Sequence, residues 1–175
     1  TKSQNLCLAG GVALNCVSNG KLLKSKIFKN IWIQPASGDA GGALGAAFGA
    51  YFKNNQRKRS AEKNDSMKGS FLGPKFSARE ISEFLRVRSI KHIHLDNSNL
   101  FSKVAEIISA ENVVGWFQGR MEFGPRALGN RSILGDPRSC RMQEVMNLKI
   151  KYRESFRPFA PAVLAHKQAE WFDFD

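Results

Sequence analysis

The strongest fold signal in this sequence is the stretch NLCLAGGVALNCVSNGKLLKS at residues 5–25. Its first five residues form a short apolar run that ends in Gly10-Gly11, which is typical of a buried strand entering a tight turn. Residues 12–25 then follow a helical pattern, although Gly20 weakens it. The stretch therefore predicts a strand, a glycine turn and a helix.

The same order of elements recurs further along the chain. The run IWIQ at residues 31–34 indicates a second strand, which Pro35 ends, and AGGALGAAFGAYFKN at residues 40–54 indicates a helix of small residues. Because Gly lowers helix stability by about 1 kcal/mol relative to Ala, such a helix is expected where another helix or a ligand approaches closely. Two strand–turn–helix units in succession indicate an α/β fold.

Composition limits the class of protein. The 175 residues are 42% hydrophobic, which is enough for a packed core and excludes a wholly disordered chain. The longest uncharged run, residues 40–52, is shorter than the ~18 residues that a membrane span needs. No signal peptide opens the sequence, and because it starts at Thr1 we expect a piece of a longer protein.

Charge and cysteine content indicate the partner and the compartment. The net charge of +12 favours an anionic partner, such as nucleic acid, a membrane surface or phosphorylated small molecules. The three cysteines lack both a disulfide framework and Cys-x-x-Cys spacing. We therefore expect reduced thiols and a cytoplasmic protein.

Residues 54–69, NNQRKRSAEKNDSMKG, interrupt the apolar patterns with five basic residues and no aromatic one. They predict a solvated linker, and hence domains at 1–54 and 76–175 joined by a linker at 55–75. Beyond it, the patterns predict helices at 77–86, 100–110, 142–150 and 166–172 and strands at 92–95, 113–118 and 159–164.

The two glycine turns form the first candidate site. Gly10-Gly11 lies between a strand and a helix, where successive backbone N–H groups can bind a phosphate or adenylate, and Asn15 can reach the same ligand. The segment GDAGG at residues 38–42 repeats this placement and adds Asp39, which is either a helix cap or a ligand for a hard cation or iron. A turn without a ligand stays open as the alternative. Of the three histidines, His92 and His94 are expected to be structural, and the isolated His166 is expected to be a surface or packing residue.

The second candidate site is the basic segment GRMEFGPRALGNRSILGDPRSCR at residues 119–141. Residues 120–157 contain nine basic and four acidic residues, and apolar residues separate them. Arginines placed in this way are expected to be held in position, because burial without an anionic partner is unfavourable. The segment indicates a pocket for a triphosphate or acyl phosphate, or a nucleic-acid groove. Internal salt bridges with the four acids are the alternative.

Four segments of the sequence resemble the O-carbamoyltransferases of nodulation-factor and antibiotic biosynthesis: residues 6–22, 31–47, 119–138 and 147–164. The resemblance implies the C-terminal piece of an actin/hexokinase-like (ASKHA) domain followed by part of a YrdC-like α/β domain. It also implies an ATP-dependent carbamoyltransferase that forms carbamoyl adenylate from carbamoyl phosphate and ATP, then transfers the carbamoyl group to a hydroxyl of a small-molecule acceptor. The family's His-x-x-x-His metal pair has no counterpart here, so this piece alone is expected to be inactive.

The resemblance also assigns roles to individual residues. Asp39 would bind iron or another divalent metal, and the adenylate would be lined by Gly10, Gly11 and Asn15. ATP, with its Mg²⁺, and carbamoyl phosphate would be bound by Arg126, Arg131, Ser132, Lys151, Arg153 and Arg157. Four of these residues are expected to be catalytic: Arg126, Arg131, Lys151 and Arg157.

Two other functions stay open at this point. A tRNA threonylcarbamoyl-type modification enzyme would share the glycine turns and would account for the isoelectric point near 10.0. A non-catalytic RNA-binding module would need exposed aromatic residues for base stacking, whereas Phe84, Trp116 and Phe159 are expected in the core. Nucleic acid is therefore disfavoured as a partner, no membrane partner is expected, and a homodimer is left open.

Overall fold

The α/β class expected from the sequence is confirmed by a computed structural model, which describes residues 2–56, 58–60 and 63–173. The chain folds into two compact units. The first contains residues 1–90 and 117–132, and the second contains residues 91–116 and 133–175. The domains 1–54 and 76–175 stay a prediction, but residues 117–132 share a unit with both glycine turns.

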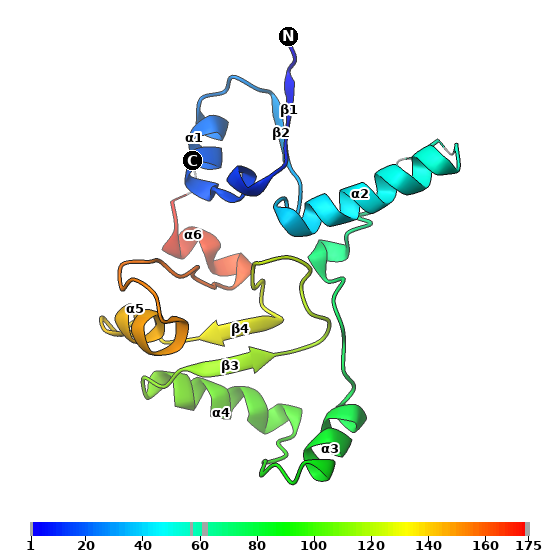
Figure 1. Ribbon diagram of the computed structural model, residues 1–175. Helices are drawn as coiled ribbons and strands as arrows, with labels where there is room; N and C mark the ends of the chain where they lie inside the picture. The colour runs from blue at the N-terminus through cyan, green and yellow to red at the C-terminus, as the bar shows by residue number, and fades with distance from the viewer. Residues whose placement is uncertain (1, 57, 61–62, 174–175) are drawn as a thin grey trace. The chain divides into compact units, whose positions relative to one another are not determined.

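The first unit is built on two parallel strands, β1 (Asn5–Leu8) and β2 (Asn30–Ile33), with Asn5 opposite Asn30 and Leu8 opposite Ile33 (Figure 1). The turns after the two strands meet at one edge, because parallel strands place their carboxyl ends together. The expectation of a fully buried first strand was wrong, since exposed and half-buried residues alternate along β1.

The single helix expected over residues 12–25 is divided in two. A 3₁₀ turn, η1 (Gly11–Leu14), is followed by α1 (Cys16–Lys24), and Asn15 lies between them with extended backbone angles. The Asn15 side chain accepts a hydrogen bond from the Ser18 N–H at 3.1 Å and caps α1. Asparagine favours this position because its side chain can replace the missing backbone partner.

The remaining elements of the first unit follow the sequence patterns more closely. Helix α2 (Asp39–Asn54) follows β2, and a short turn, η2 (Lys68–Ser70), lies in the expected linker, whose residues 57 and 61–62 fall outside the described residues. Helix α3 (Ala78–Val87) begins with the expected capping box, in which Ser77 and Glu80 bind each other's backbone N–H groups.

The second unit contains helix α4 (Asn97–Ser109), helix α5 (Met142–Val145), a π-helical turn η3 (Met146–Lys151), a 3₁₀ turn η4 (Ala165–Lys167) and helix α6 (Gln168–Trp171). Strands β3 (Val114–Phe117) and β4 (Arg131–Leu134) form a two-stranded sheet in which their directions are opposed (Figure 1). The chain crosses between the units along these strands.

Two expected strands were wrong, because residues 92–95 and 159–164 are irregular. Among the described residues, neither segment has a neighbouring strand with which to pair. Strand β4, by contrast, pairs with β3, although the sequence patterns predicted no strand at residues 131–134. The helix expected over 142–150 is likewise one α-helical turn that continues as the π-helical turn η3.

Few apolar side chains are buried in the described part of the chain. Ala13, Met142 and Met146 are each 5% exposed, and Phe84, which was expected in the core, is 56% exposed. The three cysteines are free thiols, as expected. Among the described residues, no helix combines the length and the apolar character required to cross a bilayer.

Candidate functional site

The two glycine turns are joined by a backbone hydrogen bond. The Gly10 N–H, at a φ of 97° that suits glycine, donates to the Ser37 carbonyl at 2.7 Å. A Cβ atom on Gly38 would lie 3.9 Å from the Gly11 Cα, so the turns after β1 and β2 are immediate neighbours. This is the edge of the sheet at which ligands of open parallel α/β folds bind.

The start of α2 has two features of an anion site. Gly38 occupies the N-cap position and provides no side-chain cap, so the first turn of this 16-residue helix is uncovered by a capping side chain. Ser37 is 4% exposed, and its Oγ has no hydrogen-bond partner among the described residues. Buried hydroxyls are normally paired, so the Ser37 hydroxyl is consistent with a ligand at this turn.

The basic segment packs against the second glycine turn. Gly124 (φ 111°) approaches Ala36 so closely that a Cβ on Gly124 would lie 2.7 Å from the Ala36 Cβ. The neighbouring Phe123 N–H donates to the Ser70 carbonyl at 2.6 Å, and the Arg120 guanidinium donates to the Gly73 carbonyl at 2.7 Å. The structure therefore places the first part of the basic segment, residues 119–132, in one unit with both glycine turns, which the sequence did not indicate.

We call residues 122–131 the arginine loop, because it carries Arg126 and ends at Arg131. Glu122 is the first residue of this loop, and its side chain is completely buried. Its Oε1 accepts the backbone N–H groups of Leu128, at 2.6 Å, and Asn130, at 2.8 Å. Burial raises the pKa of Glu122, the N–H donors lower it, and the result is a pKa below the ordinary value. Glu122 therefore holds the loop as an anion at neutral pH.

The predicted residues of the arginine loop have different surroundings. Arg126 is exposed, whereas Arg131 is half-buried, with its Nε 3.8 Å from the Glu122 Oε2 and its Nη2 donating to the Gly124 carbonyl at 3.2 Å. The Ser132 hydroxyl accepts the Gly129 N–H at 3.1 Å. Arg131 is therefore held from two sides, and Arg126 is presented to solvent.

The other predicted cations belong to the second unit and are organised by Asn147, which has no exposed surface. The Asn147 Nδ2 donates to the carbonyls of Ser155, at 2.9 Å, and Arg157, at 2.8 Å. Its Oδ1 accepts the Arg153 Nε at 2.6 Å. One buried amide therefore fixes the loop that follows the exposed Lys151.

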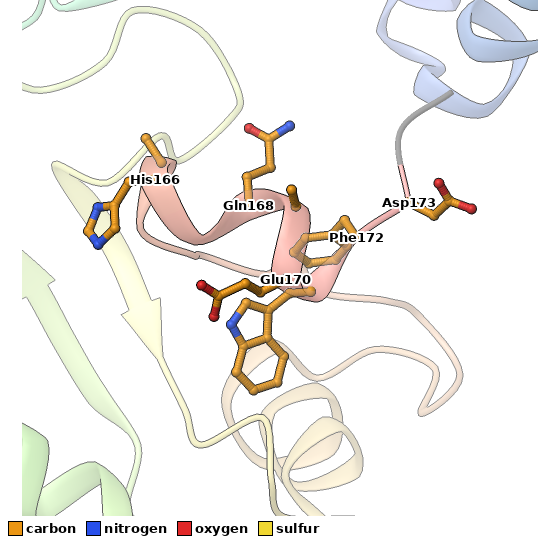
Figure 2. A pocket seen from close by; sticks show the side chains of 8 residues that line it. His166, Gln168, Glu170, Phe172 and Asp173 are labelled. Atoms are coloured by element: carbon orange, nitrogen blue, oxygen red, sulfur yellow. The ribbon is translucent and has the colours of Figure 1, made fainter.

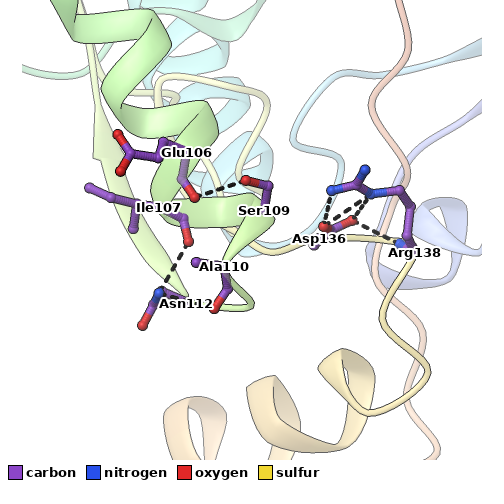
Figure 3. Close-up of polar contacts among 7 residues, drawn as sticks. All are labelled: Glu106, Ile107, Ser109, Ala110, Asn112, Asp136 and Arg138. Atoms are coloured by element: carbon purple, nitrogen blue, oxygen red, sulfur yellow. Dashed lines mark hydrogen bonds and ion pairs between the residues drawn. The ribbon is translucent and has the colours of Figure 1, made fainter.

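Salt bridges account for four of the nine basic residues at 120–157. The Asp136 carboxylate binds Arg138 through three side-chain contacts of 2.6–3.1 Å, and this pairing lowers its pKa to about 2 (Figure 3). Arg141 pairs with Glu111 at 2.9 Å, Arg157 pairs with Glu154 at 2.8 Å, and Arg131 lies beside Glu122. Three of these pairs use acids of residues 120–157, so the alternative of internal salt bridges holds for part of the segment, whereas Glu111 lies outside it. The described salt bridges do not account for Arg126 or Lys151.

Asp39 is the first residue of α2 rather than its N-cap, and it is exposed. The described residues contain no group of three or more His, Cys, Asp or Glu side chains that could hold a metal ion. A single carboxylate is one ligand of the several that iron or Mg²⁺ requires. The described residues therefore do not form a metal site by themselves.

A separate surface pocket of about 800 Å³ in the second unit is lined by residues of η4, α6 and the segment that follows them (Figure 2). Its lining includes His166, Glu170 and Trp171. Lys167 pairs with Glu170 at 2.6 Å, and Trp171 is 72% exposed. None of the sequence-predicted site residues contributes to this lining.

Sequence reasoning missed three residues of these sites. Glu122 was counted only as one acid among four, and Ser37 and Asn147 carried no motif signal. Each becomes notable through burial, because burial and hydrogen-bond partners depend on how distant segments pack. Composition and spacing do not contain that information.

Comparison with known proteins identifies the family. The family model described as carbamoyltransferase N-terminus matches residues 1–48, and the model described as carbamoyltransferase C-terminus matches residues 105–175. The protein sll1178 of Synechocystis is 60% identical over 98% of this chain and 28% of its own length.

Two nodulation proteins are also similar. NolNO of Sinorhizobium fredii is 44% identical over 99% of this chain and 25% of its own length, and NolO of Bradyrhizobium diazoefficiens is 42% identical over 99% and 31%. The chain thus spans between a quarter and a third of these relatives. With both family matches in the expected order, this chain belongs to the carbamoyltransferase family.

Proposed function

We propose that this chain is part of an ATP-dependent carbamoyltransferase that works through carbamoyl adenylate. In the first step, carbamoyl phosphate, ATP and water give carbamoyl adenylate, pyrophosphate and phosphate. In the second, the hydroxyl oxygen of a small-molecule acceptor takes the carbamoyl group, its proton is lost and AMP leaves. Family membership supports carbamoyl transfer, and the adenylate route is the chemistry that the site favours.

One observation carries this proposal. The arginine loop packs through Gly124 on the same turn, Ala36–Ser37, that hydrogen-bonds to Gly10. Cations and an uncapped helix N-terminus therefore lie in one compact unit, and both stabilise phosphate groups. A site of this composition suits a reaction with two polyanionic substrates.

The residues of the first unit would divide the work. The turns at Gly10-Gly11 and Ser37–Gly38 would bind the adenylate phosphate through backbone N–H groups, with Asn15 nearby as the cap of α1. Arg126 and Arg131 would neutralise the phosphate that leaves the carbamoyl group, because guanidinium groups bind its oxygens in pairs. Ser132 would support the loop through Gly129.

Within the second unit, Lys151 and Arg157 would bind phosphate groups of ATP. Arg153 stacks over the Phe159 ring at 4.8 Å and is bound to Asn147, so its role would be to shape the loop. In this proposal residues 1–54 belong to an ASKHA domain and residues 76–175 to a YrdC-like domain. Mg²⁺ would accompany ATP, and Asp39 would be one ligand of an iron or other divalent site that further residues complete.

The test uses the full-length protein that carries these residues. Isothermal titration with ATP and carbamoyl phosphate, and an assay of pyrophosphate release, should show binding and turnover. Arg131→Ala should weaken binding of carbamoyl phosphate at least tenfold, or about 1.4 kcal/mol. Arg86→Ala is the matched control, since Arg86 is an exposed arginine on α3 that pairs with Glu83. The proposal fails if neither substrate binds or if both variants behave alike.

A tRNA-modifying enzyme is the second candidate, because the net charge of +12 favours a polyanion. It predicts that tRNA binding, like substrate binding, depends on the arginine loop.

A further inference from the structure

The most unusual group of the first unit is the buried carboxylate of Glu122. Its two oxygens have different surroundings. Oε1 accepts two backbone N–H groups, from Leu128 and Asn130. Oε2 is buried and has no hydrogen bond among the described residues, and the nearest cation is the Arg131 Nε at 3.8 Å. One carboxylate thus contacts both the far end of the loop and its last arginine.

The Arg131 guanidinium is restrained from two directions. The Glu122 carboxylate lies beside the Arg131 Nε, and the Arg131 Nη2 donates to the Gly124 carbonyl. A guanidinium carries five N–H donors in a rigid plane, so these two contacts orient the plane and leave other N–H groups for a ligand. The Arg131 side chain is 38% exposed, and a ligand can therefore reach it.

We propose that Glu122 is a positioning residue, which fixes the arginine loop and aims Arg131 at the phosphate of an acyl phosphate or nucleotide substrate. This inference rests on the proposed function. Glu122 is buried and its contacts are with the loop, so in this proposal it acts through Arg131. The negative charge of Glu122 beside Arg131 weakens the attraction of Arg131 for an anionic ligand. The fixed orientation of the guanidinium is the gain that offsets this cost.

The sign of one measurement separates this role from that of a simple counter-charge. If Glu122 only compensated the charge of Arg131, its neutralisation would make the loop more positive and anions would bind more tightly. If Glu122 positions Arg131, neutralisation releases the guanidinium and anions bind more weakly. Glu122→Gln distinguishes the two, because Gln has the same shape as Glu without its charge.

The geometry explains why Gln cannot replace Glu122. With its amide NH₂ toward Arg131, a donor faces a donor, and in the flipped orientation the NH₂ faces the Leu128 and Asn130 N–H groups. We expect Glu122→Gln in the full-length protein to raise the KM for carbamoyl phosphate at least tenfold, with the KM for the acceptor unchanged. Glu83→Gln, which neutralises an exposed partner of Arg86, is the matched control and should leave both values unchanged.

A second variant tests the proposal if Glu122→Gln does not fold. Arg131→Lys keeps the positive charge, but a single ammonium group cannot contact Glu122 and the Gly124 carbonyl and also bind two phosphate oxygens. The variant should therefore bind carbamoyl phosphate at least tenfold more weakly. Unchanged or tighter binding in either variant overturns the positioning role. If the wild-type protein binds neither carbamoyl phosphate nor ATP, the proposed function itself fails, and the inference fails with it.

Discussion

At the scale of single residues, buried or half-buried polar groups determine what the exposed cations can do. Asp136 is 5% exposed and binds the Arg138 guanidinium in the fork geometry that makes such pairs strong (Figure 3). Arg138 thereby serves a structural purpose, although the sequence places it in the same basic segment as Arg131. The function of an arginine in this chain depends on whether an acid has already engaged it.

The Asp136 pair makes stability depend on pH. The pKa of Asp136 falls to about 2 in the folded protein, first because of its hydrogen bond with Arg138, from an ordinary value of 3.8. A depressed pKa means that the stabilisation is present above pH 4 and is lost as pH falls through about 2. Asp136→Asn should therefore flatten the fall in unfolding free energy between pH 5 and pH 2, measured by urea denaturation. Parallel pH curves for the variant and the wild type would show that the pair contributes nothing.

At the scale of elements, the start of α2 is the most tightly packed point of the candidate site. The Gly41 N–H donates to the Ala36 carbonyl at 2.8 Å, and a Cβ on Gly41 would lie 2.4 Å from that oxygen. Gly41→Ala should therefore displace the Ala36 turn and destabilise the protein by about 1–3 kcal/mol. Gly49→Ala is the control in the same helix: its Cβ would meet open space, so it should stabilise by about 1 kcal/mol. Urea denaturation measures both, and equal effects would refute the packing argument.

The loop after the π-helical turn η3 gives a second prediction at this scale. Asn147→Ala removes the donor for two carbonyls and the acceptor for Arg153, which should destabilise the second unit by about 1–3 kcal/mol. Hydrogen exchange at residues 152–157 should become faster. Asn112→Ala removes an exposed asparagine whose amide contacts Ile107 and Ala110 at 3.2 Å (Figure 3), and should change stability by less than about 0.5 kcal/mol. If the two variants lose stability equally, burial of Asn147 has no special role.

Local patterns predicted those elements whose signals are local. The capping box at Ser77 and the strand–turn–helix order were confirmed, because capping and alternation act within a few residues. Whether a segment forms a strand depends on its pairing with a distant segment, which no short window of sequence reveals. The strand predicted at residues 92–95 is therefore absent, and β4 was not predicted. For the same reason, the contact of Gly124 with Ala36 and the burial of Glu122 could not be predicted, since both depend on how the segment 117–132 packs.

At the scale of the whole molecule, charge and apolar exposure indicate different kinds of partner. The net charge of +12 favours anions, and the arginine loop concentrates part of it in a structured place. Trp32 and Phe48 are 58% and 47% exposed, which is typical of surfaces that contact further polypeptide. The relatives are three to four times as long as the span they share with this chain, so they contain further polypeptide with which such a surface can pack.

Salt dependence separates small phosphorylated substrates from nucleic acid as the partner of this charge. Binding to tRNA releases condensed counterions, so a general electrostatic contact should weaken by on the order of 10³-fold or more between 50 and 200 mM salt. Binding of ATP and carbamoyl phosphate involves fewer charges, and we expect it to weaken by less than about tenfold. Arg131→Ala should weaken carbamoyl phosphate binding at least tenfold and leave the weak tRNA contact almost unchanged. Gel shift and titration calorimetry on the full-length protein measure both. A tRNA complex that survives 200 mM salt and is lost with Arg131→Ala would instead assign the arginine loop to tRNA.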